Sequence, residues 1–230
     1  MKLSIIIPCF NEQNTISLVI DKILSSYTGE KEIIVIDDCS NDKTREILNS
    51  NLKNKIDKLI LNPKNYGKGY SVRKGINIAE GEVILIQDAD LEYDPSDYPK
   101  LLNPIINNYA DVVYGSRFKS SEETRVLFFW HTVGNKLLTL LSNIFTNLNL
   151  TDMEVCYKAF RSKLIKDINL VENRFGFEPE ITAKIAKKNA RIYEVGVKYF
   201  GRTYADGKKI NWKDGFSALR CIIKYNVFKN

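Results

Sequence analysis

Short apolar runs alternate with longer amphipathic segments through the first half of the chain, and this alternation constrains the fold more than any other feature. The apolar runs are predicted as strands, and the segments between them as helices that begin at polar or capping residues. Strands and helices alternating at this spacing favour a mostly parallel sheet with helices on both faces, an α/β fold. The predicted strands are Leu3–Ile7, Glu32–Ile36, Lys58–Leu61, Val83–Ile86 and Asp111–Tyr114.

The second half of the chain is less regular. A helix is predicted over Glu178–Asn189, and a β-like segment over Ile192–Tyr199. We also expect a strand at Cys156–Phe160 and a final helix at Trp212–Lys224. No stretch has the composition of a linker, so residues 1–230 are predicted to form a single domain.

The segment Val126–Leu150 tests whether the chain enters a membrane. It carries one formal charge, Lys136, and is longer than the ~20 residues that a transmembrane helix needs. Asparagine and serine residues interrupt it, and Leu137, Leu141 and Ile144 fall on one helical face, so an amphipathic helix is predicted. Two interpretations stay open: a core helix, or a helix lying in the membrane interface with aromatic anchors at its start. A true membrane span is the least favoured.

Composition narrows the class of partner. The net charge of +6 fits phosphorylated ligands, an anionic membrane surface or nucleic acid. Basic and aromatic residues form no nucleic-acid-binding motif, so we expect no nucleic-acid partner. The four cysteines are scattered without a CxxC pair, which argues against zinc and dithiol sites. The chain leads from Met1 and Lys2 straight into a predicted strand, so no secretory signal and a cytoplasmic location are expected.

Acidic residues follow three of the predicted strands. Glu12 follows the first strand, Asp37 and Asp38 the second, and Asp88 and Asp90 the fourth. Ligands of open α/β sheets bind at the carboxyl ends of the strands, so three acidic clusters at that edge predict a site. An Asp-x-Asp pair is suited to a hard divalent cation whose shell is completed by phosphate oxygens. A polar turn is the alternative for this pair taken alone.

Several motifs, in order along nearly the whole chain, resemble the family 2 glycosyltransferases with the GT-A fold, a Rossmann-like α/β domain. Two further segments resemble the branch of that family that transfers sugars to polyprenyl (dolichyl-type) phosphates. The resemblance implies a nucleotide-sugar-binding half at 1–120 and an acceptor half at 121–230. The family motifs are residues 5–12 (IIIPCFNE), 35–42 (VIDDCSND), 87–95 (QDADLEYDP) and 115–118 (GSRF), and the branch segments are 151–161 (TDMEVCYKAFR) and 201–209 (GRTYADGKK).

The resemblance implies a site for a nucleotide diphosphate sugar, GDP-mannose or UDP-glucose. Pro8 and Glu12 match the first loop of the nucleotide pocket, and Asp37 matches the acid that contacts the nucleoside. Asp38 is interpreted as a neighbour that braces loops. For Glu12, an interaction of its carboxylate with a helix N-terminus is the alternative.

The resemblance also implies a divalent cofactor, Mg²⁺ or Mn²⁺. Asp88 and Asp90 match the metal and diphosphate site, and Asp90 is counted among the catalytic residues. An ion there would neutralise the charge that develops on the leaving diphosphate. Glu92 stands where relatives often carry a glutamine that reaches the metal, so it is predicted as a third ligand.

Cationic residues and one further acid complete the predicted catalytic set. Arg117 can clamp phosphate oxygens with its guanidinium. Arg202, with Lys208 or Lys209, lies in a glycine-bearing loop implied to fold over the donor diphosphate and exclude water. Asp152 is the acceptor-side acid, acting either as a base or by positioning other groups, because a phosphate monoester acceptor is already ionised near neutral pH.

Two other acids, Glu178 and Glu180, are weaker candidates, since acids at the start of a helix interact with its dipole. His131, the one histidine, is assigned no catalytic role.

The sequence therefore predicts an inverting, metal-dependent transferase that moves mannose or glucose to a polyprenyl phosphate, peripheral at the cytoplasmic face of the membrane. The resembling proteins often end in transmembrane helices, and none is visible here, which favours a rival acceptor that is not a membrane lipid. A separate membrane partner protein is a further open alternative. A transferase acting on a soluble or cell-envelope saccharide and a non-catalytic nucleotide-sugar-binding protein are the rival hypotheses. A nucleotidyltransferase is a third, but its glycine-rich N-terminal phosphate loop is missing.

Overall fold

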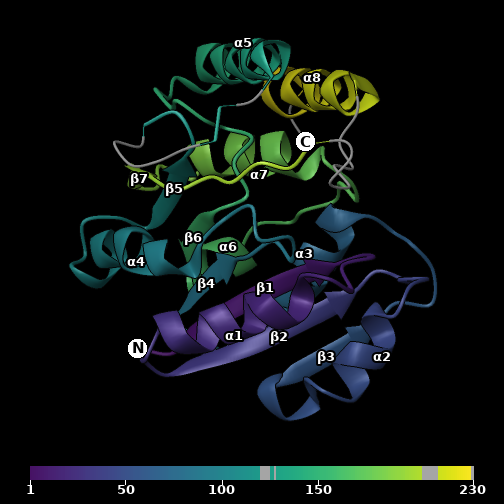
Figure 1. Cartoon of the computed structure of the whole chain (residues 1–230). Coiled ribbons are helices and arrows are strands. Elements are labelled where there is room, and N and C mark those ends of the chain that lie inside the picture. Colours follow the sequence, from purple (N-terminus) through teal and green to yellow (C-terminus); the bar gives the residue numbers. More distant parts are fainter. Residues whose placement is uncertain (120–124, 127, 204–211, 229–230) are drawn as a thin grey trace.

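A twisted, mostly parallel sheet forms the centre of the molecule (Figure 1). The computed structural model describes residues 1–119, 125–126, 128–203 and 212–228. Among these residues, the sheet has seven strands in the order β3-β2-β1-β4-β6-β5-β7. The strands are β1 (Leu3–Cys9), β2 (Lys31–Asp37), β3 (Lys58–Leu61), β4 (Val83–Ile86), β5 (Val112–Ser116), β6 (Lys158–Arg161) and β7 (Ile192–Gly196).

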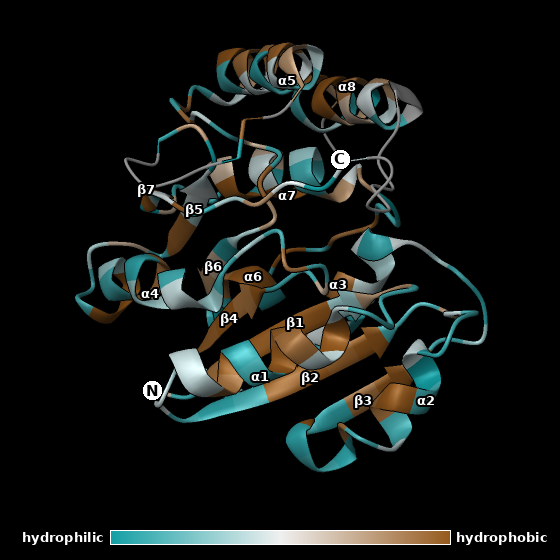
Figure 2. Ribbon diagram, in the orientation of Figure 1, coloured by the Kyte–Doolittle hydropathy of each residue, from teal (hydrophilic) through white to brown (hydrophobic). Residues whose placement is uncertain are grey.

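The predicted α/β class and the mostly parallel sheet are confirmed. β1 pairs in parallel with β2 and β4, and β2 pairs in parallel with β3. The exception is β6, which runs antiparallel to its neighbours β4 and β5. The central strands are buried on both faces, which is why they read as continuous apolar runs such as Ile5–Ile7 rather than as alternating patterns. In Figure 2 these strands form the apolar centre of the ribbon.

Helices cover the sheet and extend beyond one end of it. α3 packs on β1 and β2, and α4 on β5, β6 and β7. At the top of Figure 1, α5 and α8 lie side by side above α7, away from β1, β2 and β3. The helices are α1 (Ile16–Ser26), α2 (Thr44–Asn49), α3 (Lys68–Ile78), α4 (Tyr98–Ile106), α5 (Phe129–Thr146), α6 (Ser162–Lys166), α7 (Phe177–Ala186) and α8 (Trp212–Val227), with 3-10 turns at Lys53–Lys55 and Pro95–Asp97.

The first strand runs further than predicted. Pro8 was expected to end it, but β1 continues through Pro8 to Cys9, pairing with β2. In a strand, the backbone polar groups of residues two apart point to the same neighbouring strand, so those of Ile6 and Pro8 both point toward β4. β4 ends opposite Ile6, two residues before Pro8. Pro8 therefore lies where no strand requires an N–H group from it, so proline is tolerated there.

The amphipathic helix is confirmed, and the apolar face on which Leu137, Leu141 and Ile144 fall is divided between the core and the surface. α5 covers Phe129–Thr146, shorter than the predicted segment. Leu138 and Leu141 pack against the core, whereas Leu137 and Ile144 are 55% and 65% exposed. The apolar residues surround more of the helix than one stripe, so helical spacing alone could not choose the buried face. In the described part of the chain, no helix is both long and apolar enough to cross a membrane.

Candidate active site

A cavity of about 1010 Å³ lies where the parallel strands β1, β2 and β4 end, at the edge predicted from the acidic clusters. It reaches from the ends of these strands to α5, α7 and α8. Asp37 and Asp152 are not among the described residues that line it, and Lys208 and Lys209 lie outside the described residues. The predicted site residues that do line the cavity are Pro8, Glu12, Asp88, Asp90, Glu92, Arg117 and Arg202.

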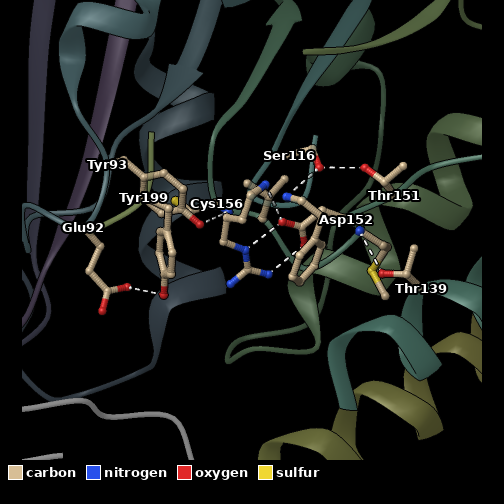
Figure 3. A network of polar contacts seen from close by, with 12 residues as sticks. Glu92, Tyr93, Ser116, Thr139, Thr151, Asp152, Cys156 and Tyr199 are labelled. Carbon is tan, nitrogen blue, oxygen red and sulfur yellow. Dashed lines mark hydrogen bonds and ion pairs between the residues drawn. The ribbon is translucent and has the colours of Figure 1, made fainter. Parts of the chain in front are cut away.

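Arg202 draws three of the predicted acids together. Its guanidinium Nη2 lies 2.8 Å from Oδ2 of Asp90, and its Nη1 lies 3.2 Å from Oε2 of Glu12. Its backbone N–H donates to Oε1 of Glu92 at 2.8 Å. Glu92 also accepts a hydrogen bond from the Tyr199 hydroxyl at 3.1 Å, as Figure 3 shows. The acids that follow β1 and β4 thus share one cation, which neutralises part of their mutual repulsion.

Asp88 faces a different cation. Its Oδ1 lies 2.8 Å from the ammonium of Lys68, which starts α3. Burial opposes the ionisation of Asp88, but the charge of Lys68 outweighs it and lowers the pKa of this carboxyl. Burial raises the pKa of Asp90 to about 8, and the neighbouring charges of Asp88 and Glu92 add to that rise. The pair therefore holds one ionised carboxylate and one carboxyl that ionises more easily if another cation approaches.

The side chains at this edge are of the type that binds a divalent ion, but they do not form a complete coordination site. In the described part of the chain, no group of three or more His, Cys, Asp or Glu side chains is arranged to hold a metal. The carboxylates of Asp88, Asp90 and Glu92 nonetheless line one cavity, and the Arg202 guanidinium already stands beside two of them as a cation. Hard divalent ions take oxygen ligands from a few carboxylates plus substrate phosphates. This donor set suits such an ion if a diphosphate supplies the remaining oxygens.

Asp152 holds Arg117 from behind the cavity wall. Its side chain is fully buried, and its Oδ2 and Oδ1 each lie 2.7 Å from the guanidinium, at Nε and Nη2. Oδ2 also accepts the backbone N–H of Arg117 at 3.0 Å. Figure 3 shows the polar network around Asp152, which includes Ser116 and Thr151. Of the two roles that the sequence left open for Asp152, this geometry favours positioning.

The two acids that follow β2 have different surroundings. Asp37 is fully buried, and its Oδ2 lies 2.6 Å from Nε of Arg45 on α2. Its Oδ1 has no hydrogen-bond partner among the described residues. Asp38 lines the cavity and accepts the backbone N–H groups of Tyr66 at 3.0 Å and Gly67 at 2.7 Å. Asp38 therefore braces the loop before α3, and a contact between Asp37 and a nucleoside stays a prediction.

Two glutamates lining the cavity were missed or undervalued by sequence reasoning. Glu154, in the loop before β6, was given no role, and Glu178 was only a weak candidate. Burial raises the pKa of Glu154 to about 8, with the charge of Glu178 adding to it. Glu180 lies outside the cavity lining and accepts the backbone N–H groups of Val171 and Glu172, each at 2.8 Å. The sequence could not show that Glu178 lines the cavity and Glu180 does not, because both lie in the first turn of α7 and either could interact favourably with the helix dipole.

Comparisons with known proteins agree with the motifs. The model of a family described as "Glycosyl transferase family 2" matches residues 4–168. The chain belongs to glycosyl transferase family 2. This member of the family is 28% identical over 213 residues to undecaprenyl-phosphate 4-deoxy-4-formamido-L-arabinose transferase from Photorhabdus laumondii, a match covering 90% of this chain and 62% of that protein. It is 28% identical over 217 residues to dolichol-phosphate mannosyltransferase from Pyrococcus furiosus, covering 91% and 61%.

Both relatives carry a polyprenyl phosphate in their names, as does the branch of family 2 that the sequence motifs resemble. The chain spans about three fifths of the length of these curated relatives. Among solved structures, glucosyl-3-phosphoglycerate synthase from Mycobacterium tuberculosis, in complex with Mn²⁺, uridine diphosphate and glucosyl-3-phosphoglycerate, has a TM-score of 0.76. That likeness covers 100% of this chain and 81% of the other at 17% identity, and it confirms the predicted GT-A fold.

Proposed function

We propose that this family 2 glycosyltransferase moves a hexose, mannose or glucose, from a nucleotide diphosphate sugar to a polyprenyl phosphate, with inversion and with Mg²⁺ or Mn²⁺. The observation that carries the proposal is the reach of one cavity. It extends from Asp88 and Asp90 past Arg117 to Trp130, which is 78% exposed on α5. A donor diphosphate at the acids and an acceptor phosphate arriving past α5 can therefore meet in the same space.

The chemistry requires little from a base. An oxygen of the acceptor phosphate attacks the anomeric carbon, and the bond from that carbon to the donor diphosphate breaks, with its electron pair leaving on the nucleoside diphosphate. The acceptor oxygen is already ionised near neutral pH. Arg117, held by Asp152, offers a guanidinium to a phosphate, and Arg202 places a second cation beside the acids. A divalent ion held by Asp88, Asp90 and Glu92 would neutralise charge on the leaving diphosphate.

The outer faces of α5 and α8 support a lipid acceptor. The two helices pack side by side, and both expose large apolar side chains. Between Phe129 and Thr146 the one formally charged residue is Lys136, a cation, so α5 attracts rather than repels anionic lipid. The exposed apolar residues are Phe129, Trp130, Val133, Leu137, Leu140 and Ile144 on α5 and Phe216, Ile223 and Val227 on α8, followed by Phe228. We propose that this apolar face lies in the membrane interface, at the cytoplasmic side.

Vesicle flotation tests the apolar face. The chain should float with vesicles of phosphatidylcholine and phosphatidylglycerol, and less with phosphatidylcholine alone. Replacing Trp130 and Phe216 by serine should reduce flotation, because both aromatic side chains lie on the face. Tyr109→Ser is the matched control, since Tyr109 is also exposed and comes three residues after the end of α4. In Figure 1, α4 lies away from α5 and α8. If all variants floated equally, the proposal that this apolar face contacts the membrane would be rejected. If the wild type did not float, a separate membrane partner protein would be favoured.

The activity itself is tested by product identification. The protein is incubated with GDP-mannose or UDP-glucose, Mg²⁺ or Mn²⁺ and a short polyprenyl phosphate, and the expected product is the glycosyl phosphoprenol, identified by mass. Asp88→Asn and Asp90→Asn should each lower the rate at least about 100-fold, because the ion contributes several kcal/mol of charge stabilisation. Transfer to saccharides but never to the lipid phosphate would refute the acceptor, and nucleotide-sugar binding without any product would indicate a binding protein.

A further inference from the structure

Two glutamates form part of the wall of the cavity that also contains the donor acids and Arg117. Glu178 is the second residue of α7 and is only 4% exposed, and Glu154 lies in the loop before β6. One carboxylate oxygen of each, Oε1, is buried without a hydrogen-bond partner among the described residues. Buried polar atoms are satisfied in the great majority of cases, so two such acceptors in one cavity indicate a ligand that bonds them.

Two lysines fix Glu178 in place. Lys158, which is fully buried, donates from its ammonium to Oε2 of Glu178. The other oxygen, Oε1, lies 3.9 Å from the ammonium of Lys68, which itself pairs with Asp88 at 2.8 Å. Glu178 is thus one lysine away from the acid expected to face the diphosphate. Its free oxygen is held rigidly, so it can select a partner by position.

Glu154 lines the same cavity as Glu178 and Arg117. The charge of Glu178 raises the pKa of its carboxyl, and the charges of Lys158 and Arg117 lower it, so Glu154 lies within electrostatic reach of all three. Burial keeps Glu154 protonated at neutral pH, so it can donate a hydrogen bond as well as accept one. The transferred sugar must sit between the donor diphosphate and the acceptor phosphate, and both carboxyl groups line the cavity in which the two would meet.

We propose that Glu178 and Glu154 bind hydroxyl groups of the sugar being transferred and that this subsite takes an uncharged sugar. The inference rests on the proposed function, since it places the sugar between diphosphate and acceptor. A sugar hydroxyl donates to Oε1 of Glu178, and another accepts from the protonated Glu154. The two nearest lysines, Lys68 and Lys158, already pair with carboxylates, so the acid group of a uronic sugar gains no cation from them.

The test compares binding of a nucleoside diphosphate with and without its sugar. Calorimetry measures the dissociation constants of UDP, UDP-glucose, GDP and GDP-mannose with Mn²⁺, for the wild type and four variants. Glu178→Gln and Glu154→Ala should weaken nucleotide-sugar binding about tenfold while changing nucleoside diphosphate binding less than about twofold. Glu154→Gln should stay near wild type, because an amide replaces a protonated carboxyl. Glu180→Gln is the control, because Glu180 is buried on the same turn of α7 as Glu178. In this variant, the ratio of the dissociation constants of nucleotide sugar and nucleoside diphosphate should equal that of the wild type.

The outcomes separate the two proposals. If the wild type binds none of the four nucleotides, the proposed function fails. If it binds nucleotide and sugar nucleotide equally, or if Glu178→Gln weakens both alike, the sugar subsite fails while the proposed function stands. Melting temperatures identify variants that lose their fold, and Glu154→Ala provides a second route because it leaves the Lys158–Glu178 pair intact. UDP-glucuronate should bind wild type about tenfold more weakly than UDP-glucose, and equal binding would reject the preference for an uncharged sugar.

Discussion

The pair formed by Arg117 and Asp152 allows the sharpest test of the site's construction. Asp152→Asn removes the charge of a fully buried carboxylate from a two-point ion pair, whose guanidinium is 14% exposed, while keeping the side-chain shape. Breaking a buried pair by removing one partner costs about 3–5 kcal/mol, because the remaining charge is left uncompensated. Asparagine keeps one acceptor oxygen, so we expect the lower end of that range, about 3 kcal/mol.

The expected loss converts into a melting temperature. For a chain of this size, each kcal/mol shifts the midpoint by about 2–4 °C, so Asp152→Asn should melt roughly 6–12 °C lower. Asp21→Asn is the matched control: its ion pair with Lys55 has the same 2.7 Å distance, but the side chains are 55% and 42% exposed. An exposed pair contributes about 1 kcal/mol or less, so the control should melt within a few degrees of wild type.

A double variant tests whether the two side chains act as one unit. Arg117→Met combined with Asp152→Asn should cost clearly less free energy of unfolding than the sum of the single changes, because no buried charge is left alone. A midpoint for Asp152→Asn within about 2 °C of wild type, or strict additivity in the double variant, would refute the positioning role. Lost transfer activity with an unchanged midpoint would instead identify Asp152 as a group acting on the acceptor.

Two further predictions concern pH and packing. Burial opposes ionisation of Glu32, but hydrogen bonds from a hydroxyl, a backbone N–H and an ammonium lower its pKa to about 2. Its contribution to stability is therefore present above about pH 4.5 and lost as pH falls toward 2, and Glu32→Gln should flatten that part of an acid-unfolding curve. Gly75→Ala should lower the melting temperature, because the added methyl would lie 2.5 Å from Ile6, whereas Gly134→Ala, with nothing within 4 Å, should raise stability by about 0.5–1 kcal/mol.

The fold could be predicted from sequence because local patterns determine it. Val83–Ile86 and Lys58–Leu61 have the predicted bounds, since each is a short apolar run bounded by turn or polar residues. The edge that carries the acids followed from the direction of parallel strands. The buried face of α5 did not follow, because apolar residues surround most of that helix and only packing selects among them.

Which of two neighbouring acids faces the ligand could not be predicted either. Successive residues at a strand end point to opposite sides, so one of Asp37 and Asp38 must turn away from the other. Asp37 turns to Arg45 on α2 and Asp38 to the cavity, a choice decided by the position of that helix. The two aspartates can be read from the sequence, but which of them faces the cavity depends on the tertiary structure.

The charge balance of the site is also tertiary, and it bears on how the site would be used. Arg202 reaches Glu12 across 190 residues of sequence, and Lys68 and Lys158 pair with Asp88 and Glu178. Carboxylates packed this closely are stable because internal cations compensate them. A divalent ion that binds these carboxylate oxygens, together with its diphosphate, must replace ion pairs within the protein by ion pairs with the ligand. The net cost of binding is then set by the exchange of partners rather than by the desolvation of bare carboxylates, which lets buried acids hold an ion without destabilising the free protein.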